Sequence, residues 1–291
     1  PLVAACREGH IKVVQLLLAR KGIYINQGYD KKYGTPLVAA CQSGRADVVG
    51  LLLNRQYNHL GIGINLTNVH GWTPLSFACQ NGYVEIVKLL LASGLKKSET
   101  NLPFYVIQIN QATEEGITPL SLACANGHVD VVGLLLDREE IQINQGGENG
   151  FTPLVAACQN GQVEVVKLLL AREGIQINQA REGGVTPLYI ACQGGHVDVV
   201  RLLLNSQYNH LGIGINLTRE GGVTPLYIAC QNGQVEVVKL LLAREEIQIN
   251  LAREDGATPL FIACHNGWVE VVKLLLTREE IQINLAETHG L

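Results

Sequence analysis

The stretch GGVTPLYIACQNGQVEVVKLLLAREEIQIN at residues 221–250 has a near twin, NGFTPLVAACQNGQVEVVKLLLAREGIQIN, at residues 149–178. Repetition over this length is typical of a chain built from stacked copies of one small structural unit. The repeat, rather than the total of 291 residues, therefore predicts the domain organisation.

Three markers recur along the whole chain. Thr-Pro-Leu occurs seven times, Leu-Leu-Leu occurs eight times, and an Ile-Asn pair closes eight segments. From one Pro to the next the steps are 35, 38, 45, 34, 34, 38 and 34 residues, so three repeats are longer than the basic 34. We predict one continuous array of eight repeats, with boundaries near 1–34, 35–72, 73–117, 118–151, 152–185, 186–223, 224–257 and 258–291. Because the chain opens inside a motif, at Pro1-Leu2, we expect it to be a fragment of a longer array.

The repeat that begins at Thr224 predicts two short helices. Thr224 suits a helix N-cap, Pro225 suits the first helical position, and a helix is expected from Leu226 to about Asn232. Gly233 can end that helix in the left-handed conformation. A second helix is expected over 235–242, followed by an extended segment over 247–250, where apolar and polar residues alternate.

Helices of this length are marginal in isolation, because a stable isolated helix needs about 12–15 residues. The apolar residues of 235–242 cover more than one side of the predicted helix, so both sides are expected to meet neighbours. Glu236 and Lys239 lie three residues apart on the remaining polar face and are expected to form a weak ion pair. Stacking of adjacent repeats should therefore supply the stability.

Composition argues against several classes of partner. The net charge is −4 and the isoelectric point is about 6.1, which does not favour nucleic-acid binding. No apolar run approaches the roughly 20 residues that a membrane helix requires, so no membrane partner is expected.

The recurring Thr-Pro-Leu, Ala-Ala or Ala-Cys pair, Gly, Val-Val, Leu run and closing Asn together resemble the ankyrin repeat family over nearly the whole chain. The resemblance implies an all-α solenoid of stacked helix–loop–helix repeats with projecting β-hairpin loops. It also implies a non-enzymatic scaffold that binds proteins, with partner residues on the hairpin tips and the inner helices.

The chain departs from the family pattern at a position after Thr-Pro-Leu. The family often has His there, whereas this chain has Val, Ser, Tyr or Phe, at Val38, Ser76, Ser121, Val155, Tyr189, Tyr227 and Phe261. We expect apolar packing to replace the hydrogen bond that the His supplies. The Asp common at the hairpin tip is often replaced by Arg, at Arg181, Arg219 and Arg253.

The titratable and nucleophilic residues predict no catalytic, cofactor or metal site. Each of the eight cysteines occupies the same position in its repeat, and neighbouring helices lie about 8–10 Å apart. That separation exceeds the reach of a disulfide, so we expect reduced, buried thiols and an intracellular, cytoplasmic protein. The His residues lack metal-ligand spacing, and no Gly-x-Ser-x-Gly motif is present. The Asn-Leu-Thr sequons at Asn65 and Asn216 are read as coincidental.

Three insertions lengthen the basic repeat. NRQYNHLGIGINLT at 54–67 and NSQYNHLGIGINLT at 205–218 differ at one position and start 151 residues apart, which equals four repeat steps. They indicate duplication of a four-repeat block, and either inherited loop length or partner contact can explain them. The contact hypothesis names Tyr57, His59, Tyr208 and His210, and Phe104 and Tyr105 in the unique insertion at 93–110.

The residue before six of the seven Thr-Pro-Leu motifs has an apolar side chain, and by the resemblance it lies at the foot of a hairpin and faces the concave groove. These residues are Trp72, Ile117, Phe151, Val185, Val223 and Ala257. They form either a binding stripe or a packing contact between hairpins. Polar residues after Ala-Cys are expected to face the same groove: Gln80, Asn81, Gln159, Asn160, Gln193, Gln231 and Asn232.

These observations favour a scaffold that binds another protein on its concave face. The alternative is a regulatory or targeting arm of a larger enzyme or channel whose active part lies outside the fragment. Neither terminal repeat has an obviously polar capping surface, so end-to-end self-contact is also a hypothesis.

Overall fold

The computed structural model describes residues 1–28, 34–93, 106–147 and 149–284. The chain divides into two compact units, unit 1 over Pro1–Glu148 and unit 2 over Asn149–Leu291. The boundary falls in the hairpin of the predicted repeat 118–151, and the single continuous array stays a prediction.

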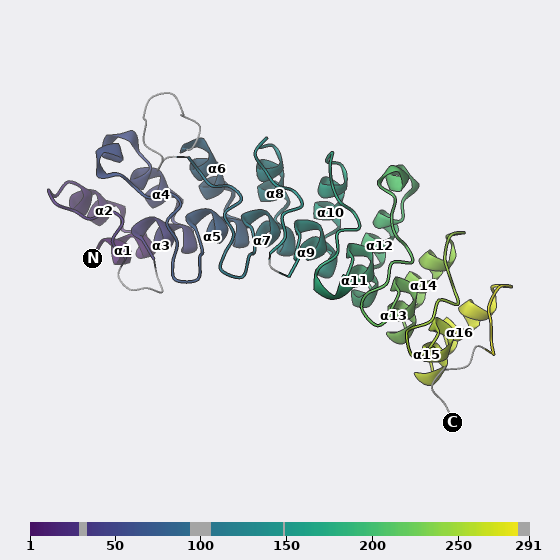
Figure 1. Ribbon diagram of the computed structural model, residues 1–291. Helices are drawn as coiled ribbons and strands as arrows, with labels where there is room; N and C mark the ends of the chain where they lie inside the picture. Colours follow the sequence, from purple (N-terminus) through teal and green to yellow (C-terminus); the bar gives the residue numbers. More distant parts are fainter. Residues whose placement is uncertain (29–33, 94–105, 148, 285–291) are drawn as a thin grey trace. The chain divides into compact units, whose positions relative to one another are not determined.

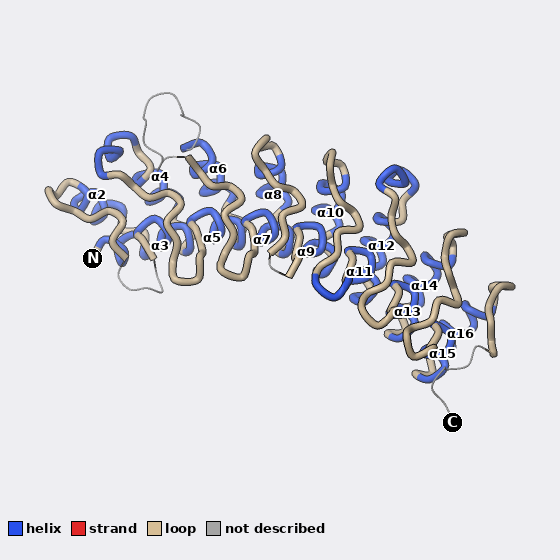
Figure 2. Tube along the Cα trace, viewed as in Figure 1, coloured by secondary structure: helices blue, strands red, loops and turns tan. Residues whose placement is uncertain are grey.

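The described part of unit 1 contains four pairs of short α-helices (Figures 1 and 2). Odd-numbered helices, here called inner helices, pack on one another in sequence, and even-numbered helices, called outer helices, do the same. The inner helices are α1 (Leu2–Glu8), α3 (Pro36–Gln42), α5 (Pro74–Gln80) and α7 (Pro119–Ala125). The outer helices are α2 (Ile11–Leu18), α4 (Ala46–Leu52), α6 (Val84–Ser93) and α8 (Val129–Leu136), and the 3₁₀ helix η1 (Arg55–Leu60) follows α4.

Unit 2 repeats the same arrangement within itself. Its inner helices are α9 (Pro153–Gln159), α11 (Pro187–Gly194), α13 (Pro225–Gln231) and α15 (Pro259–His265). Its outer helices are α10 (Val163–Leu170), α12 (Val197–Leu203), α14 (Val235–Leu242) and α16 (Val269–Leu276), with 3₁₀ helices η3 (Glu182–Gly184) and η4 (Ser206–Leu211). The prediction of an all-α solenoid of stacked helix–loop–helix repeats is confirmed.

The helix start and stop signals act as the sequence predicts. The Thr224 hydroxyl oxygen accepts a hydrogen bond from the Tyr227 N–H at 3.0 Å, and Pro225 is the first helical residue of α13. Gly233 follows the C-cap Asn232 and takes a left-handed φ of 67°, which glycine adopts without the steric cost of a Cβ atom. The same Thr cap begins the six other helices that carry Thr-Pro-Leu.

The core consists of repeated apolar positions on both rows of helices. In α14, Val237, Val238, Leu241 and Leu242 are buried, because both sides of the helix meet a neighbouring repeat. In every inner helix except α15, where Cys264 is exposed, both residues of the Ala-Cys pair are buried, and their small side chains let successive inner helices approach closely. The predicted pair of Glu236 and Lys239 forms at 2.6 Å on the exposed face. Such an exposed pair contributes at most about 1 kcal/mol.

All eight cysteines are free thiols, and all except Cys264 are buried. Burial raises the pKa of the Cys6 thiol to about 12 and raises that of Cys41 and Cys158 further. These groups stay neutral at physiological pH and act as small apolar side chains.

The hairpin loops between repeats contain no regular strand in the described residues. Isolated antiparallel bridges join Arg181 to Val185 and Arg219 to Val223. Neighbouring tips are linked by single backbone bonds, such as that from the Glu220 N–H to the Gly183 carbonyl at 2.9 Å.

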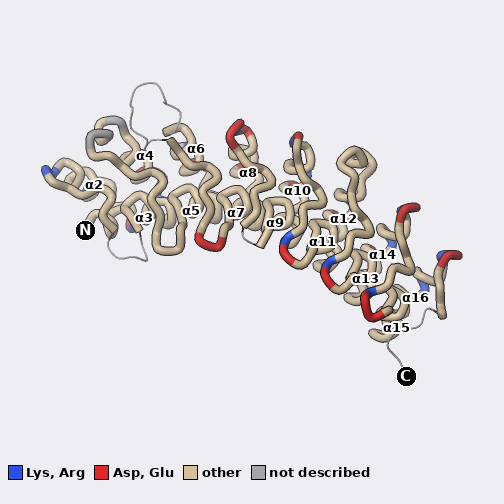
Figure 3. The backbone as a smooth tube through the Cα atoms, viewed as in Figure 1, with Lys and Arg blue, Asp and Glu red and all other residues tan. Residues whose placement is uncertain are grey.

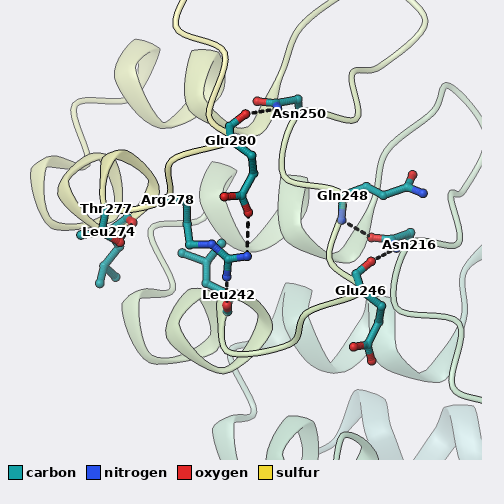
Figure 4. A network of polar contacts seen from close by, with 9 residues as sticks. All are labelled: Asn216, Leu242, Glu246, Gln248, Asn250, Leu274, Thr277, Arg278 and Glu280. Atoms are coloured by element: carbon teal, nitrogen blue, oxygen red, sulfur yellow. Dashed lines mark hydrogen bonds and ion pairs between the residues drawn. The ribbon is translucent and has the colours of Figure 1, made fainter.

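The extended segment expected at 247–250 forms no ladder, and the closing Asn residues explain why (Figure 4). The Asn216 side-chain amide donates to the Glu246 carbonyl at 2.8 Å, and its oxygen accepts from the Gln248 N–H at 2.9 Å. The backbone groups that a partner strand would engage are therefore bonded to one side chain of the preceding repeat. Asn26, Asn65, Asn110, Asn178 and Asn250 make the equivalent pair of bonds.

Replacement of Leu241 by Ala should lower the free energy of unfolding by about 2–5 kcal/mol, because the side chain is fully buried and its loss leaves a cavity. Urea denaturation followed by circular dichroism measures the change. Leu276→Ala is the matched control, since Leu276 is 48% exposed on α16 and should cost less. Equal losses for the two variants would contradict the stacking model.

Candidate functional site

The residues before Thr-Pro-Leu close the hairpins through their backbones. The Trp72 carbonyl accepts from the Asn68 N–H at 3.1 Å, and the Ile117 carbonyl accepts from the Thr113 N–H at 3.0 Å. The carbonyls of Val185 and Val223 accept in the same way from Arg181 and Arg219. The Ala257 carbonyl accepts likewise from the Arg253 N–H at 3.0 Å, so these residues share one backbone role and differ in their side chains.

The side chains at this position differ in accessibility. Trp72, Ile117 and Phe151 are partly exposed, whereas Val185 and Val223 are only 8% and 9% exposed. The two valines offer little surface to a partner. The larger side chains Trp72 and Ile117 in unit 1, and Phe151 in unit 2, are the members of the predicted stripe that can make contacts.

Phe77 connects Trp72 to the polar end of α5. The rings of Trp72 and Phe77 lie with centroids 5.0 Å apart, and the Asn81 side-chain amide donates to the Phe77 carbonyl at 2.8 Å. Gln80 and Asn81 are both exposed next to this contact. One inner helix of unit 1 therefore presents a half-buried indole and two amides as a connected surface.

Unit 2 carries a similar series of exposed amides on its inner helices. Gln159, Asn160, Gln193 and Asn232 are exposed, and Gln231 is partly exposed. The asparagines use their N–H groups within the protein, since Asn160 donates to the Ala156 carbonyl and Asn232 to the Gln193 carbonyl. Their side-chain oxygens accept no hydrogen bond within the described structure. We call the exposed ends of the inner helices, with the hairpin-foot side chains, the inner-helix surface of each unit.

A second set of bonds fixes these helix ends, and the sequence did not reveal it. The residue just before an outer helix binds the last carbonyl of an inner helix in the preceding repeat. His128 Nε2 lies 2.9 Å from the Gln80 carbonyl oxygen. Trp268 Nε1 donates a hydrogen bond to the Gln231 carbonyl at 3.0 Å. The carbonyl can only accept, so His128 Nε2 carries the hydrogen. His196 and Arg45 make the same bond to Gln159 and Arg7.

Polar contacts also occur where apolar packing was expected after Thr-Pro-Leu. The Ser76 hydroxyl is 2.8 Å from that of Thr73, and Ser121 pairs similarly with Thr118. The Arg253 guanidinium lies over the Tyr227 ring at 5.7 Å and donates to its hydroxyl at 3.4 Å. The expectation of purely apolar packing was wrong for these repeats, because a buried hydroxyl keeps a hydrogen-bond partner.

Charged residues gather at the hairpin tips (Figure 3), although inner helix α1 also ends in the charged residues Arg7 and Glu8. In unit 2 three described hairpin tips place an Arg beside an exposed Glu, at Arg181-Glu182, Arg219-Glu220 and Arg253-Glu254. In unit 1 one tip carries Glu114 and Glu115. The amide-rich helix ends between them are uncharged, so they suit hydrogen bonding to a polar, neutral surface.

Two of the three insertions, at 54–67 and 205–218, form short 3₁₀ helices that lie after the outer helices, apart from the inner-helix surface. Tyr208 is partly exposed and His210 is exposed in η4, and Tyr57 is partly exposed in η1. The side chain of His59, and Phe104 and Tyr105 entirely, lie outside the described residues. Sequence analysis did not identify Leu66 and Leu217, which are 42% and 43% exposed beside these helices.

Comparison with protein-family models matches most of the chain. A model described as ankyrin repeats in three copies matches residues 2–101, 99–181 and 178–253, and a single ankyrin repeat model matches 255–287.

The chain belongs to the ankyrin repeat family.

Its fold is also similar to a solved member of that family. The crystal structure of the human ASB11 ankyrin repeat domain shares 27% sequence identity, with a TM-score of 0.66. The match covers 85% of this chain and 99% of that chain. No curated protein matches. Ankyrin repeats are generally protein-interaction modules, and the geometry here fits that class.

The described residues of this ankyrin array show no cluster of potential metal ligands. They contain no group of three or more His, Cys, Asp or Glu side chains arranged to hold a metal ion. Within them, no helix has the length and apolarity to cross a membrane. The sequon residues Asn65 and Asn216 hold their side chains in inter-repeat bonds, which leaves their amide nitrogens engaged.

A glycine follows the C-cap of most inner helices, and at Gly233 it leaves space for the residue that binds the inner-helix carbonyl. Gly233 has a φ of 67°, and a Cβ atom there would lie 2.6 Å from the Trp268 ring. Gly267 has a φ of 72° and no atom within 4 Å of such a Cβ. Alanine substitution at these two glycines therefore separates two free-energy costs. At Gly267 only the left-handed backbone is strained, whereas at Gly233 the contact with Trp268 is also lost.

Gly267→Ala should lower the free energy of unfolding by about 1–2 kcal/mol, the penalty of a left-handed non-glycine residue. Gly233→Ala should lower it further, because Trp268 must also move and lose its bond to Gln231. Urea denaturation and the fluorescence of Trp268 report the two effects. The inter-repeat role of Trp268 fails if both variants unfold at the same urea concentration.

Proposed function

We propose that the protein is a non-catalytic scaffold that binds another protein through the inner-helix surface, the concave face of the ankyrin family. The observation that carries this is the uncharged surface formed by the partly exposed Trp72 and the exposed amides of Gln80 and Asn81 at the end of α5. Its backbone is fixed from both sides, by the Asn81 bond to Phe77 and by the His128 bond to Gln80. A partner therefore meets a preorganised surface and pays little conformational entropy at this site.

Unit 2 supports the same proposal with Phe151 and the amides of Gln159, Asn160, Gln193, Gln231 and Asn232. Aromatic side chains bordered by polar groups are typical of contact centres in protein interfaces. The same surface would serve an independent scaffold or the targeting arm of a larger enzyme or channel. The partner we propose is a protein, in an intracellular, cytoplasmic setting that the eight free thiols favour.

A double variant, Trp72→Ala with Phe151→Ala, tests the proposal by affinity capture from an extract of cells that contain the protein. Loss of two aromatic contacts should reduce recovery of the partner at least tenfold, because aromatic hot spots are each worth about 2 kcal/mol or more. Quantitative mass spectrometry measures the recovery.

Val129→Ala is the control, since Val129 is exposed on outer helix α8, away from the inner-helix surface. Circular dichroism confirms that each variant is folded. Equal recovery by wild type and the double variant would place the binding site elsewhere.

We also propose end-to-end contact between copies of the chain. On α16, Leu276 is 48% exposed, whereas the equivalent Leu242 on α14 is 7% exposed, and Ile283 is 66% exposed against 2% for Ile249. The first repeat exposes Val13 and Leu16 on α2. The exposed side of the last repeat and the exposed side of the first repeat correspond to the two surfaces that meet where interior repeats stack.

Sedimentation equilibrium over a range of concentrations tests this contact. The wild-type mass should rise with concentration, and Leu276→Lys should keep the chain monomeric, because a buried Lys would carry an unpaired charge into the contact. Val129→Lys, on an exposed outer-helix position, should leave association unchanged. A wild-type chain that stays monomeric at every concentration would exclude the contact.

A further inference from the structure

The first and last repeats leave opposite sides of the repeat uncovered. Val13 on α2 is 45% exposed, whereas Val271, at the same position of α16, is fully buried. In reverse, Leu276 is exposed on α16, whereas Leu18, at the same position of α2, is buried. The side that one of these repeats exposes is therefore the side that the other has covered, so the two exposed faces are complementary and not alike.

The exposed side of the last repeat extends over its inner helix and its closing segment. Phe261 on α15 is exposed, whereas Tyr227, at the same position of α13, is buried. Ile283 is exposed, whereas its equivalent Ile249 is buried. We call the exposed residues of the last repeat, Phe261, Leu276 and Ile283, the last-repeat face. We call the exposed residues Val13 and Leu16 of the first repeat the first-repeat face.

Hydrogen bonds that cross the interior contacts have possible donors and acceptors in the terminal repeats as well. The Trp268 indole donates to the Gln231 carbonyl of the preceding repeat at 3.0 Å. His10 occupies the Trp268 position in the first repeat, and His265 occupies the Gln231 position in the last repeat. His10 is exposed, so its imidazole N–H can donate to the His265 carbonyl of another copy.

An arginine makes a second bond of this kind in unit 2. Arg244 donates to the Leu204 carbonyl at 3.2 Å, and that carbonyl lies at the end of outer helix α12 in the preceding repeat. Arg20 occupies the Arg244 position in the first repeat and is exposed. Leu276 occupies the Leu204 position in the last repeat. The Arg20 guanidinium of one copy can therefore bind the Leu276 carbonyl of another.

The closing Asn makes a third link between repeats. Asn250 binds a carbonyl and an N–H of the next repeat at 2.7 and 2.9 Å, and the bond to the carbonyl is drawn in Figure 4. Asn284 is the closing Asn of the last repeat, and its side chain is exposed. The equivalent backbone groups of the first repeat are the Gly22 carbonyl and the Tyr24 N–H. The last repeat therefore offers the side chain, and the first repeat offers the two backbone groups that it would bind.

Charge favours contact between the two different faces over contact between like faces (Figure 3). The loop after α16 carries Glu279 and Glu280, whereas the loop after α2 carries Arg20 and Lys21. Loops at this position are neighbours in the stack, because the closing Asn of one repeat binds the loop of the next. Docking of the first repeat on the last repeat would place the basic loop beside the acidic one. Contact between two first repeats or two last repeats would place like charges together.

We propose that copies of the chain associate head to tail, with the first-repeat face of one copy covering the last-repeat face of another in the register of interior repeats. This inference rests on the proposed end-to-end contact and adds its polarity and its hydrogen bonds. A second copy is the occupant because its first repeat combines an apolar side, matching hydrogen-bonding groups and a basic loop. Because the two faces differ, a pair of copies keeps one uncovered face of each kind.

Two variants of the full chain, each with one face blocked, test the polarity. Leu16→Lys blocks the first-repeat face and Leu276→Lys blocks the last-repeat face, since each Lys would carry an unpaired charge into an apolar contact. Both positions are exposed in the single chain, so both variants should fold as the wild type does. Circular dichroism checks the fold. Sedimentation equilibrium measures the mass of each variant alone and of an equimolar mixture.

Each variant alone should be monomeric, because head-to-tail contact needs both faces. The mixture should form a dimer and nothing larger, since one intact face of each kind remains. Val129→Lys, on exposed outer-helix position 129, should associate as the wild type does. Association of either variant alone, or a mixture that stays monomeric while the wild type associates, would overturn the head-to-tail polarity.

A second comparison tests the register of the contact. Arg20→Met removes the donors but keeps an extended side chain, and it should weaken association about tenfold through loss of a charged hydrogen bond. Arg201→Met is the matched control, because Arg201 pairs with Asp198 on the exposed face of α12, and it should leave association unchanged. Equal association by Arg20→Met and the wild type would overturn the register.

A charge exchange tests the pairing of the two loops. Lys21→Glu should weaken association by at most about fivefold, because exposed ion pairs are weak. Addition of Glu279→Lys to the same chain should restore association, because the opposite charges are then exchanged between the two faces. A double variant that associates no better than Lys21→Glu alone would overturn the proposed neighbourhood of these loops.

The outcomes also separate this inference from the proposed function. A wild-type chain that stays monomeric at every concentration would overturn the end-to-end contact and this inference with it. Wild-type association with a monomeric mixture would overturn only the head-to-tail polarity. Capture of a protein partner by the inner-helix surface is measured separately with Trp72→Ala and Phe151→Ala, so neither result affects it.

Discussion

Contact between the apolar sides of neighbouring repeats is the interaction on which the rest of the structure depends. The inner helices are seven or eight residues long, too short to be stable alone. Each described inner helix between two others in its unit buries nearly all of its side chains, down to the fully buried Ala-Cys pair. Stability is therefore a property of adjacent repeats, and the residues that make it recur because each repeat solves the same packing problem.

Apolar contact does not by itself determine how one repeat is aligned with the next. Hydrogen bonds between repeats determine this alignment. The closing Asn of one repeat binds two backbone groups of the next, as Asn216 does with Glu246 and Gln248. At the other end of the repeat, His128 and Trp268 bind the last carbonyl of an inner helix in the preceding repeat. Because hydrogen bonds depend on distance and direction, these links fix how far each repeat is displaced from its neighbour. The exposed amides beside these bonds are held in place as a consequence.

The residues that stack the repeats and the residues available to a partner occupy different positions in the repeat. Positions that stack, such as Leu241 and Cys230, are nearly invariant among repeats, and seven of the eight thiols are buried there as small apolar side chains. The side chains that differ among repeats, such as Trp72 and Phe151, lie at the hairpin feet, and the insertions at 54–67 and 205–218 lie after the outer helices. A partner can therefore be selected by a few surface residues while the supporting array remains uniform.

The sequence by itself determined the repeat, the helix limits and the buried positions. Thr224, Pro225 and Gly233 define one helix through local capping and backbone preferences, and the spacing of Val and Leu identifies the apolar faces. These are short-range signals, so they can be read from neighbouring residues alone. The same signals suggested an extended segment at 247–250, because alternation of apolar and polar residues does not distinguish a strand from a turn bonded to a distant side chain.

Only the tertiary structure decided which of the similar surface residues are accessible. Val185 and Trp72 occupy the same position in the repeat, yet the valine is buried and the indole is half-exposed. The bond from Trp268 to Gln231 and the stacking of Arg253 on Tyr227 join residues 37 and 26 positions apart. Their partners are set by the stacking of one repeat on the next, and the distance between atoms in adjacent repeats is not encoded in any single stretch of sequence.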